Sequence, residues 1–296
     1  MTPGFLCIDK PSGPTSRDVV NVVQPWARPA KVGHAGTLDP LASGVLVVAI
    51  GAATRLISVL QGQPKRYRAA FRLGLETDTE DITGRVIATH PLPEGAVTIP
   101  QLTAVLRGFV GTITQTPPQF SAVHVGGRRA YEWARQGAEV SLAPRTVEIY
   151  ALDLVAFTPP EFTVDVACSG GTYIRALGRD IGRQLGCGAV MTELRRTAVG
   201  PFALTHAVAL ADLTADNWRS KLWPTTAAVS HLPMRSLSPA EITAVLHGRT
   251  IRGDPLRPLS EGQEVGLLDG TGALLAIGVV TPDYQVHPRL VLAGAN

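Results

Sequence analysis

Cysteine is scarce in this sequence. The 296 residues contain three cysteines, Cys7, Cys168 and Cys187, and no Cys-x-x-Cys pair. This low, odd number excludes a framework of disulfides and offers no zinc-ligand or dithiol motif. We therefore expect three reduced, apolar side chains in a protein of the cytoplasm.

Long apolar runs are also missing. The apolar stretch before Arg55 is too short to span a membrane, and the N-terminus, which carries Asp9 and Lys10, has no run of signal-peptide length. Charged residues make up 17% of the chain and the mean hydropathy is +0.15, which argues against long disordered tails. The expectation is a folded cytoplasmic protein.

A strong overall charge is absent as well, since the formal net charge is only +3. The segment from Leu232 to the C-terminus is nearly neutral, so the positive excess lies earlier in the chain. It is grouped in clusters such as Lys65-Arg66-x-Arg68, Arg128-Arg129, Arg175/Arg179/Arg183 and Arg195-Arg196. Such clusters fit contacts with phosphate, although solvated surface charge is the commoner explanation of any one of them.

What the sequence has in abundance is glycine and proline, 30 and 23 residues. This composition indicates many turns and a sheet-rich body, and the length favours two domains or one large and one small domain. Periodicity predicts strands and helices over the ranges 4–9, 45–50, 65–73 and 162–168 (strands) and 16 to about 25, 55–60, 102–109 and 172–185 (helices).

One loop stands out as a candidate site. The segment from Gly33 to Gly44 reads Gly-His-Ala-Gly-Thr-Leu-Asp-Pro-Leu-Ala-Ser-Gly and precedes the apolar run 45–50. Its glycines permit unusual backbone conformations, and Pro40 fixes the chain directly after Asp39. Asp39 would thus be held at the edge of a buried strand. Gly, Asp, Pro and Ser are also common in turns. The alternative interpretation is therefore that this segment only ends a loop.

The segment 76–84 is acidic and lies between two predicted strands. Asp78, Glu80 and Asp81 could suggest a cation loop, but the twelve-residue spacing and the closing glutamate of such a loop are missing. A solvated hairpin turn is the better interpretation.

A second informative segment begins at Gly170-Gly171, where a strand turns into the helix predicted over 172–185. Ile174, Leu177, Ile181 and Leu185 form an apolar stripe on this helix, and Arg175, Arg179 and Arg183 recur every four residues on nearly the opposite side. An arginine face is usually solvated. At a glycine-rich junction, however, it is placed to meet an anion or a carboxylate.

These segments resemble the tRNA pseudouridine synthase B (TruB) family. The loop Gly33–Gly44 is similar to that family's Gly-His-x-Gly-x-Leu-Asp-Pro-x-Ala-x-Gly signature, over more than ten positions. Further similar segments are Asp9–Ser16, Lys65-Arg66-Tyr67, Gly171–Arg175 and Glu193–Arg196, so the resemblance runs from about Phe5 to Val199. One departure is His124, where many relatives carry lysine; a phosphate contact there would be weaker and pH-dependent.

The resemblance implies an α+β fold with a mixed, largely antiparallel central sheet, flanking helices and a cleft across its middle. It assigns residues 1–230 to a pseudouridine synthase catalytic domain and 231–296 to a small PUA-like, RNA-binding β-barrel. The hairpin pattern around Gly270 and Gly272 and the strand 290–292 agree with that last assignment.

The implied activity is isomerisation of uridine to pseudouridine at position 55 in the T arm of transfer RNA. The reaction has no net redox change, so no cofactor and no metal are expected. Asp39 would be the nucleophile or charge stabiliser on a flipped-out uridine, and attack at C1′, attack at C6 and a glycal route stay open. Arg175 would pair with Asp39 and keep it ionised, with a phosphate or surface arginine as the alternative.

The other implied roles concern the bound base. Tyr67 would stack on the uracil and could act as a base, while Tyr173 and Leu194 would line the pocket; plain core packing is the alternative for all three. His34 would fill the gap that the flipped nucleotide leaves. The expected partner is the T-arm stem-loop, bound by a monomer. Two rival functions are a non-catalytic RNA-binding or RNA-folding protein with the same cleft, and aspartate-based phosphoryl transfer, whose phosphate loop the sequence lacks.

Overall fold

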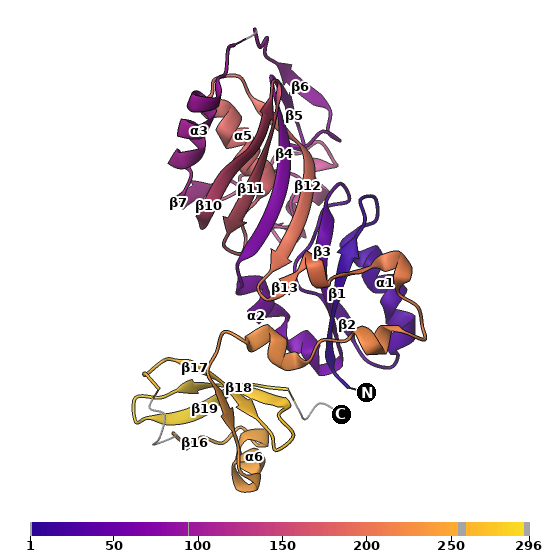
Figure 1. Ribbon diagram of the computed structural model, residues 1–296, viewed down its shortest axis with the longest axis vertical. Helices are drawn as coiled ribbons and strands as arrows, with labels where there is room; N and C mark the ends of the chain where they lie inside the picture. Colours follow the sequence, from indigo (N-terminus) through magenta and orange to yellow (C-terminus); the bar gives the residue numbers. More distant parts are fainter. Residues whose placement is uncertain (1, 94, 254–258, 293–296) are drawn as a thin grey trace.

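A mixed β-sheet forms the centre of the protein in the computed structural model, which describes residues 2–93, 95–253 and 259–292 (Figure 1). The strand order is β14 (Val208–Ala209), β1 (Gly4–Lys10), β3 (Ser43–Ile50), β12 (Ala189–Val199), β4 (Lys65–Leu73), β11 (Glu161–Cys168), β10 (Arg145–Thr158), β7 (Gly111–Gln115). In addition, β2 (Val32–His34) pairs with β3 and β13 (Phe202–Ala203) with β12. Only the pairs β1/β14 and β3/β12 are parallel, which confirms the predicted mixed, largely antiparallel sheet.

Strand β4 shows why the sequence pattern predicts the sheet so well. Tyr67, Phe71 and Leu73 are buried, whereas Arg66 and Arg68 on the alternate positions are exposed. Side chains on a strand alternate between its two faces, so the period of two in the sequence becomes one buried and one solvated face. Strand β3 has no such alternation and is buried on both faces, as its unbroken apolar run predicts.

Four of the described helices pack on this sheet: α1 (Ser16–Ala27), α2 (Ile57–Gly62), α3 (Ile99–Gly108) and α5 (Ile174–Gln184). Helix α4 (Ala130–Ala134) belongs to a separate unit. Short 3₁₀ turns occupy Gly51–Leu56, Leu204–His206, Leu210–Asp212, Trp218–Lys221 and Thr225–Val229. Helices α3 and α5 pack on each other and on the strands β10 and β12, so this part of the molecule has a sheet layer and a helix layer (Figure 1).

Helix α1 continues past the predicted stop near Pro25. Thr15 caps its N-terminus and Asp18 returns a hydrogen bond, which is the capping box that the predicted start at Thr15-Ser16 suggests. Pro25 lies inside the last turn, and the helix ends at Ala27 because Arg28 is extended and precedes Pro29. Pro25 has no N–H to donate to the carbonyl of Asn21, and the helix ends two residues later.

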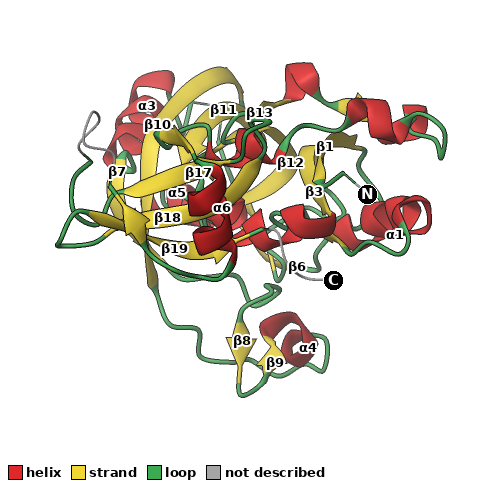
Figure 2. Cartoon of the chain, turned by 90° about the horizontal axis from the view of Figure 1, so that it is seen from below, coloured by secondary structure: helices red, strands yellow, loops and turns green. Residues whose placement is uncertain are grey.

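Two small hairpins flank the site. The predicted hairpin around the acidic turn is present as β5 (Leu75–Thr77) and β6 (Val86–Thr89). A second hairpin, β8 (His124–Val125) and β9 (Arg128–Arg129), leads into α4, and this unit projects from the body of the molecule in Figure 2.

A separate sheet of five strands follows at the C-terminal end. It contains β15 (Met234–Ser236), β17 (Glu264–Leu268), β18 (Leu274–Val280), β19 (Gln285–Val291) and β16 (Ile251–Arg252), with helix α6 (Pro239–Leu246) beside it. The predicted hairpin around Gly270 is confirmed as β17 and β18, and the sheet fits a PUA-like domain. Leu274 and Ile277 share an apolar cluster with Phe5 of β1, so this sheet packs on the central one.

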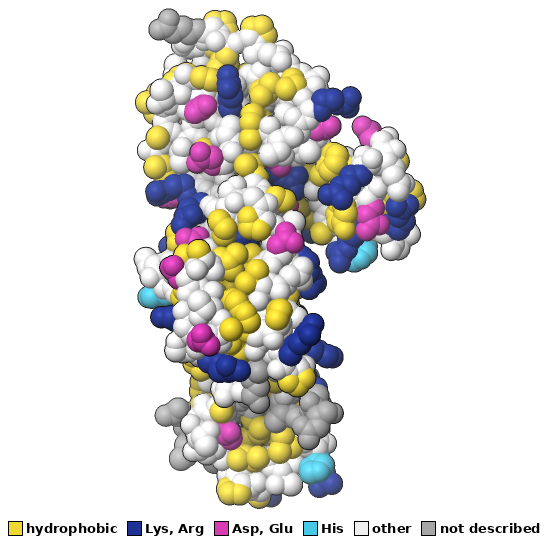
Figure 3. Space-filling view, turned by 90° about the vertical axis from the view of Figure 1, so that its right-hand side faces the viewer, with side chains coloured by type: hydrophobic (Ala, Val, Ile, Leu, Met, Phe, Trp, Pro, Cys, Tyr) yellow, Lys and Arg dark blue, Asp and Glu magenta, His cyan; other side chains and the backbone are white. Residues whose placement is uncertain are grey.

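None of the described helices is long and apolar enough to cross a membrane. On the face shown in Figure 3, Lys and Arg side chains are spread along the length of the molecule with Asp and Glu among them. The positive charge is therefore distributed over this face instead of forming one large patch.

Candidate active site

A cavity of about 400 Å³ lies where β4 and β12 meet the glycine-rich loop and the N-terminal end of α5. Its lining includes Asp39, Tyr67, Tyr173, Arg175 and Leu194, five of the six residues that the sequence analysis selects. They come from four separate segments of the chain, which the fold brings into one concave surface. Such a cavity with a few convergent polar groups is the usual form of a small-molecule site.

The loop around Asp39 is fixed by hydrogen bonds from other segments. The hydroxyl of Ser16, on α1, accepts from the backbone N–H of Leu38 at 2.8 Å and donates to its carbonyl at 3.0 Å. The carbonyl of Pro40 accepts from the N–H of Gly13 at 2.8 Å. Asp39 itself keeps 39% of its side chain exposed, so a rigid backbone presents an accessible carboxylate.

Gly44, at the end of this loop, is required by a close approach of two strands. Its φ is +97°, and a Cβ at this position would lie 2.2 Å from the backbone oxygen of Arg196 on β12. A glycine is the residue that allows both the left-handed conformation and the contact. The last glycine of the loop signature thus serves the pairing of β3 with β12.

Arg175, the second residue of α5, pairs with Asp39. One of its Nη atoms lies 2.9 Å from Asp39 Oδ2, and only 6% of the arginine side chain is exposed. Its N–H groups also donate to the carbonyls of Thr79 at 2.7 Å and Phe120 at 3.0 Å. The guanidinium is therefore held from several sides and has little freedom to leave the carboxylate.

Asp81 is a second carboxylate near the same guanidinium and is a site residue that the sequence analysis missed. Its Oδ2 is 3.8 Å from Arg175 Nε, and the residue is 5% exposed, not solvated as the hairpin interpretation expects. Its Oδ1 accepts hydrogen bonds from the side chains of Thr79 and Thr83. Threonines two positions before and after an aspartate were the available sign that this carboxylate is fixed within the turn.

Tyr67 places its phenol in the cavity from β4 with 9% of the residue exposed. Burial raises the pKa of this phenol, and the positive charge of Arg196 opposes the rise. The neutral phenol is thus the resting form at neutral pH.

Lys65 lies two residues earlier on the same strand. It is 6% exposed, and its Nζ donates to the carbonyl oxygens of Gln61 and, at 2.6 Å, Gln63. Burial, with the charge of Arg196 as a second cause, lowers the pKa of Lys65 to about 8. This lysine ties the end of α2 to the start of β4 beneath the cavity.

Tyr173 and Leu194 complete the walls. Gln115 of β7 holds the backbone of Tyr173, accepting from its N–H at 2.9 Å and donating to its carbonyl at 3.0 Å. The guanidinium of Arg145 lies over the Tyr173 ring, 5.5 Å from its centroid. Leu194 is 9% exposed and forms an apolar part of the surface.

His34 is the selected residue that does not line the cavity. It ends β2, opposite Val48 of β3, and is half-buried with no hydrogen-bond partner for its Nδ1. Burial, followed by the charges of Arg17 and Arg196, lowers its pKa, so the imidazole is neutral at pH 7. The departure noted at His124 lies elsewhere, exposed on β8 of the projecting unit.

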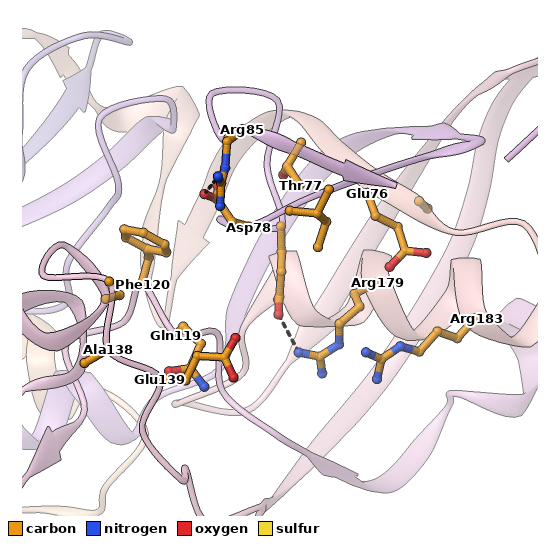
Figure 4. A pocket seen from close by; sticks show the side chains of 15 residues that line it. Glu76, Thr77, Asp78, Arg85, Gln119, Phe120, Ala138, Glu139, Arg179 and Arg183 are labelled. Atoms are coloured by element: carbon orange, nitrogen blue, oxygen red, sulfur yellow. Dashed lines mark hydrogen bonds and ion pairs between the residues drawn. The ribbon is translucent and has the colours of Figure 1, made fainter. Parts of the chain in front are cut away.

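A second cavity of about 410 Å³ borders the first across α5. Figure 4 shows Arg179 and Arg183 of α5 pointing into it, with Gln119 and Phe120 on another side. Arg179 pairs with Glu80 at 2.6 Å and with Asp180 at 2.8 Å. The three arginines of α5 therefore differ in their surroundings. Arg175 and Arg179 pair with carboxylates from other segments, whereas the side chain of Arg183 is 65% exposed.

Comparisons with known proteins identify the family of this chain. Residues 24–174 match the model of the TruB family pseudouridylate synthase N-terminal domain, and residues 175–242 match the tRNA pseudouridylate synthase B C-terminal domain. The change from one model to the next falls inside α5, so it does not mark a structural boundary.

Curated relatives and solved structures cover nearly the whole chain. A tRNA pseudouridine synthase B of Moorella thermoacetica is 46% identical, covering 99% of this chain and 100% of its own length. One of Heliobacterium mobile is 42% identical, with 98% of this chain and 94% of that protein covered. The chain of a Cbf5-Nop10-Gar1 complex aligns with a TM-score of 0.75 at 29% identity, covering 98% of this chain and 84% of that one.

The fold is therefore that of a pseudouridine synthase. At this level of identity over the full chain, the protein belongs to the TruB family of tRNA pseudouridine synthases.

Within the described ranges, no group of three or more His, Cys, Asp or Glu side chains is arranged to hold a metal ion.

Proposed function

We propose that this protein isomerises uridine to pseudouridine at position 55 in the T arm of transfer RNA. The observation that carries the proposal is the Asp39 carboxylate, accessible in the cavity and 2.9 Å from a buried guanidinium. The TruB relatives support transfer RNA as the substrate. The family resemblance of the loop supports the T arm as the modified region.

Asp39 acts as the nucleophile on a uridine that has left the RNA stack. The carboxylate bonds to C1′ as the C1′–N1 bond breaks, or adds to C6 before that bond breaks, and it leaves again when or after C5 joins C1′ of the turned uracil. The C5 proton goes to solvent, and N1 gains a proton. The atoms balance without an oxidant or an energy donor. Arg175 holds the carboxylate of Asp39 in a fixed orientation toward the bound uridine. The nucleophile is thereby positioned before the reaction begins.

Tyr67, Tyr173 and Leu194 hold the base. An aromatic ring gives a sequence-tolerant stacking surface for a nucleobase, and Leu194 closes the apolar side of the cavity. Extrusion of the base costs about a few kcal/mol for lost stacking. A neutral His34 has the flat shape needed to occupy the place of the extruded base.

The domain organisation is part of the proposal. We assign residues 1–230 to catalysis and residues 231–296 to accessory RNA contact, a division supported by the separate sheet that begins at Met234. We place the protein in the cytoplasm, an assignment supported by three free and buried cysteines, and we expect it to act as a monomer.

The experiment is tritium release from transfer RNA labelled with [5-³H]uridine, in the presence and absence of EDTA. We expect release of one tritium per transfer RNA at the same rate under both conditions. A purified, folded protein that releases no tritium would contradict the proposed activity, and a rate abolished by EDTA would contradict the proposed metal-free chemistry.

A further inference from the structure

Arg196 is a charged residue of the cavity that the proposed reaction leaves without a role. It lies on β12 directly opposite Tyr67 of β4, so both side chains project from the same face of the sheet. Only 2% of its surface is exposed, although it belongs to the lining of the cavity. A guanidinium so deeply buried is expensive to desolvate and needs a structural or chemical reason.

The first part of that reason is contact with the loop of Asp39. Arg196 Nε donates to the carbonyl of Val45 at 2.7 Å, and its Nη atoms donate to the carbonyls of Gly36 at 3.0 Å and Thr37 at 3.5 Å. The planar fork of an arginine can make these bonds together, whereas a lysine has a single nitrogen. Arg196 therefore connects the start of β3 to the residues just before Asp39.

The second part is its charge. Within the described part of the chain, none of the ion pairs includes Arg196, so carbonyl oxygens solvate this cation without a carboxylate to neutralise it. The phenol of Tyr67 is the acidic group facing it across the strand pair. Burial raises the pKa of that phenol, and the positive charge of Arg196 lowers it.

The other charged and titratable groups around the phenol are few. Cys168 on β11 and Asp39 on the loop both raise the pKa of Tyr67, and Lys65 precedes it on its own strand. Arg196 is thus the group on a neighbouring element that favours negative charge on the phenol.

We propose that Arg196 is a positioning residue for the isomerisation, which fixes the loop before Asp39 and stabilises negative charge on the phenol of Tyr67. This inference rests on the proposed function, because it assigns Tyr67 a proton to give up or share during the reaction. A single guanidinium thereby sets the geometry of one reacting group and the acidity of the other.

Ser16 provides the matched control. It fixes the same loop through both backbone groups of Leu38, is itself 2% exposed, and carries no charge. Ser16→Ala therefore loosens the loop without removing positive charge from the neighbourhood of Tyr67.

The test measures two quantities in Arg196→Gln, Arg196→Lys and Ser16→Ala. The first is the single-turnover rate of tritium release together with the affinity for transfer RNA. The second is the ionisation of Tyr67, followed by ¹⁹F NMR in protein that contains a fluorinated tyrosine, whose phenol titrates closer to neutral pH. The protein has five tyrosines, and Tyr67→Phe identifies the resonance.

In Arg196→Gln we expect a rate lowered on the order of 100-fold with affinity changed less than about threefold, as for removal of one preorganised donor. The titration of Tyr67 moves to higher pH. Arg196→Lys keeps that titration near its original position but loses rate through the loop. Ser16→Ala also loses rate and leaves the titration unchanged.

A folded Arg196→Gln variant with an unmoved Tyr67 titration, or either Arg196 variant with the wild-type rate, would overturn the inference. Circular dichroism establishes folding, and Arg196→Lys carries the test if Arg196→Gln does not fold. The titration needs no RNA, so an inactive wild-type protein would reject the proposed function without deciding the interaction between Arg196 and Tyr67.

Discussion

The carboxylate of Asp39 meets a guanidinium that also lies near a second acid. Arg175 is 2.9 Å from Asp39 and 3.8 Å from Asp81. When Asp39 is substituted, Arg175 still has the carboxylate of Asp81 nearby, so its buried charge is not left without a partner. An Asp39 variant can therefore lose activity without losing stability.

Asp39→Asn is expected to abolish turnover while leaving affinity for transfer RNA within about threefold of wild type. The lost charge acts in the reaction and not in docking, so the change falls on the rate of the chemical step. The rate of tritium release and a filter-binding isotherm measure the two effects. Full activity in this variant would show that Asp39 is not the nucleophile.

Protonation of His34 is expected to make the protein less stable in acid. Its pKa is lowered in the folded state, so the unfolded chain binds the proton first as the pH falls below about 6.5. Stability from this residue is therefore complete above that pH and decreases below it. Urea unfolding at pH 7 and pH 5.5 should show a smaller loss in His34→Gln than in wild type; equal losses would show that His34 does not contribute.

The residues predicted from sequence and those missed differ in one respect. Asp39, Tyr67 and Arg175 belong to recognisable segments, and the structure gathers them in one cavity. Asp81 lies outside these segments, and Arg196 lies in the similar segment Glu193–Arg196 without an assigned role. Their roles depend on their neighbours: a helix arginine for Asp81, and a tyrosine and two loop carbonyls for Arg196. Periodicity within one segment contains no information about such long-range contacts.

At the scale of elements, helix α5 delivers Arg175 because it lies close against the sheet. Gly178 faces the ring of Phe71 on β4, and a Cβ there would lie 2.3 Å from that ring. The helix can therefore approach the strand only with a glycine at this position.

Gly178→Ala is expected to destabilise the protein by about 1–3 kcal/mol and to lower the turnover rate. Alanine is the better helix former by about 1 kcal/mol, but overpacking against Phe71 exceeds this gain and displaces the helix that carries Arg175. Gly108→Ala, at the end of α3 with no atom within 4 Å of the added Cβ, is the matched control and should not lose stability. Equal unfolding midpoints for the two variants would contradict the packing argument.

The sequence predicts an element well where its periodicity is strong. It predicts the burial of side chains less well where a contact from a distant segment determines that burial. The pattern over 65–73 gives β4 with its full bounds, and the alternation of its burial is as expected. The acidic turn 76–84 gives a hairpin, but two of its carboxylates, those of Asp81 and Glu80, meet Arg175 and Arg179 and are withdrawn from solvent. A charged turn is solvated only when no opposite charge packs against it.

At the scale of the whole molecule, two sheets share an apolar cluster that joins β1 to the C-terminal strands. The family resemblance implies a small C-terminal β-domain, and the structure has a separate five-stranded sheet there. How that unit packs depends on residues as distant in sequence as Phe5 and Ile277, which no local pattern connects.

The three cysteines report on this packing. All are buried, and burial raises the pKa of the Cys7 thiol to about 12 and that of Cys168 to about 11. Thiolate is the reactive form, so we expect no reaction with dithionitrobenzoate in the native protein at pH 8 and three equivalents after unfolding. Rapid reaction of the native protein would show that the cores are open.

We propose above that the protein isomerises one uridine of transfer RNA in the cavity around Asp39. The most direct measurement maps pseudouridine along a T-arm stem-loop after incubation with the wild-type protein and with Asp39→Asn. We predict a single modified position, 55, with the wild-type protein and none with the variant. Modification at another uridine, or an unmodified stem-loop with active wild-type protein, would contradict the account.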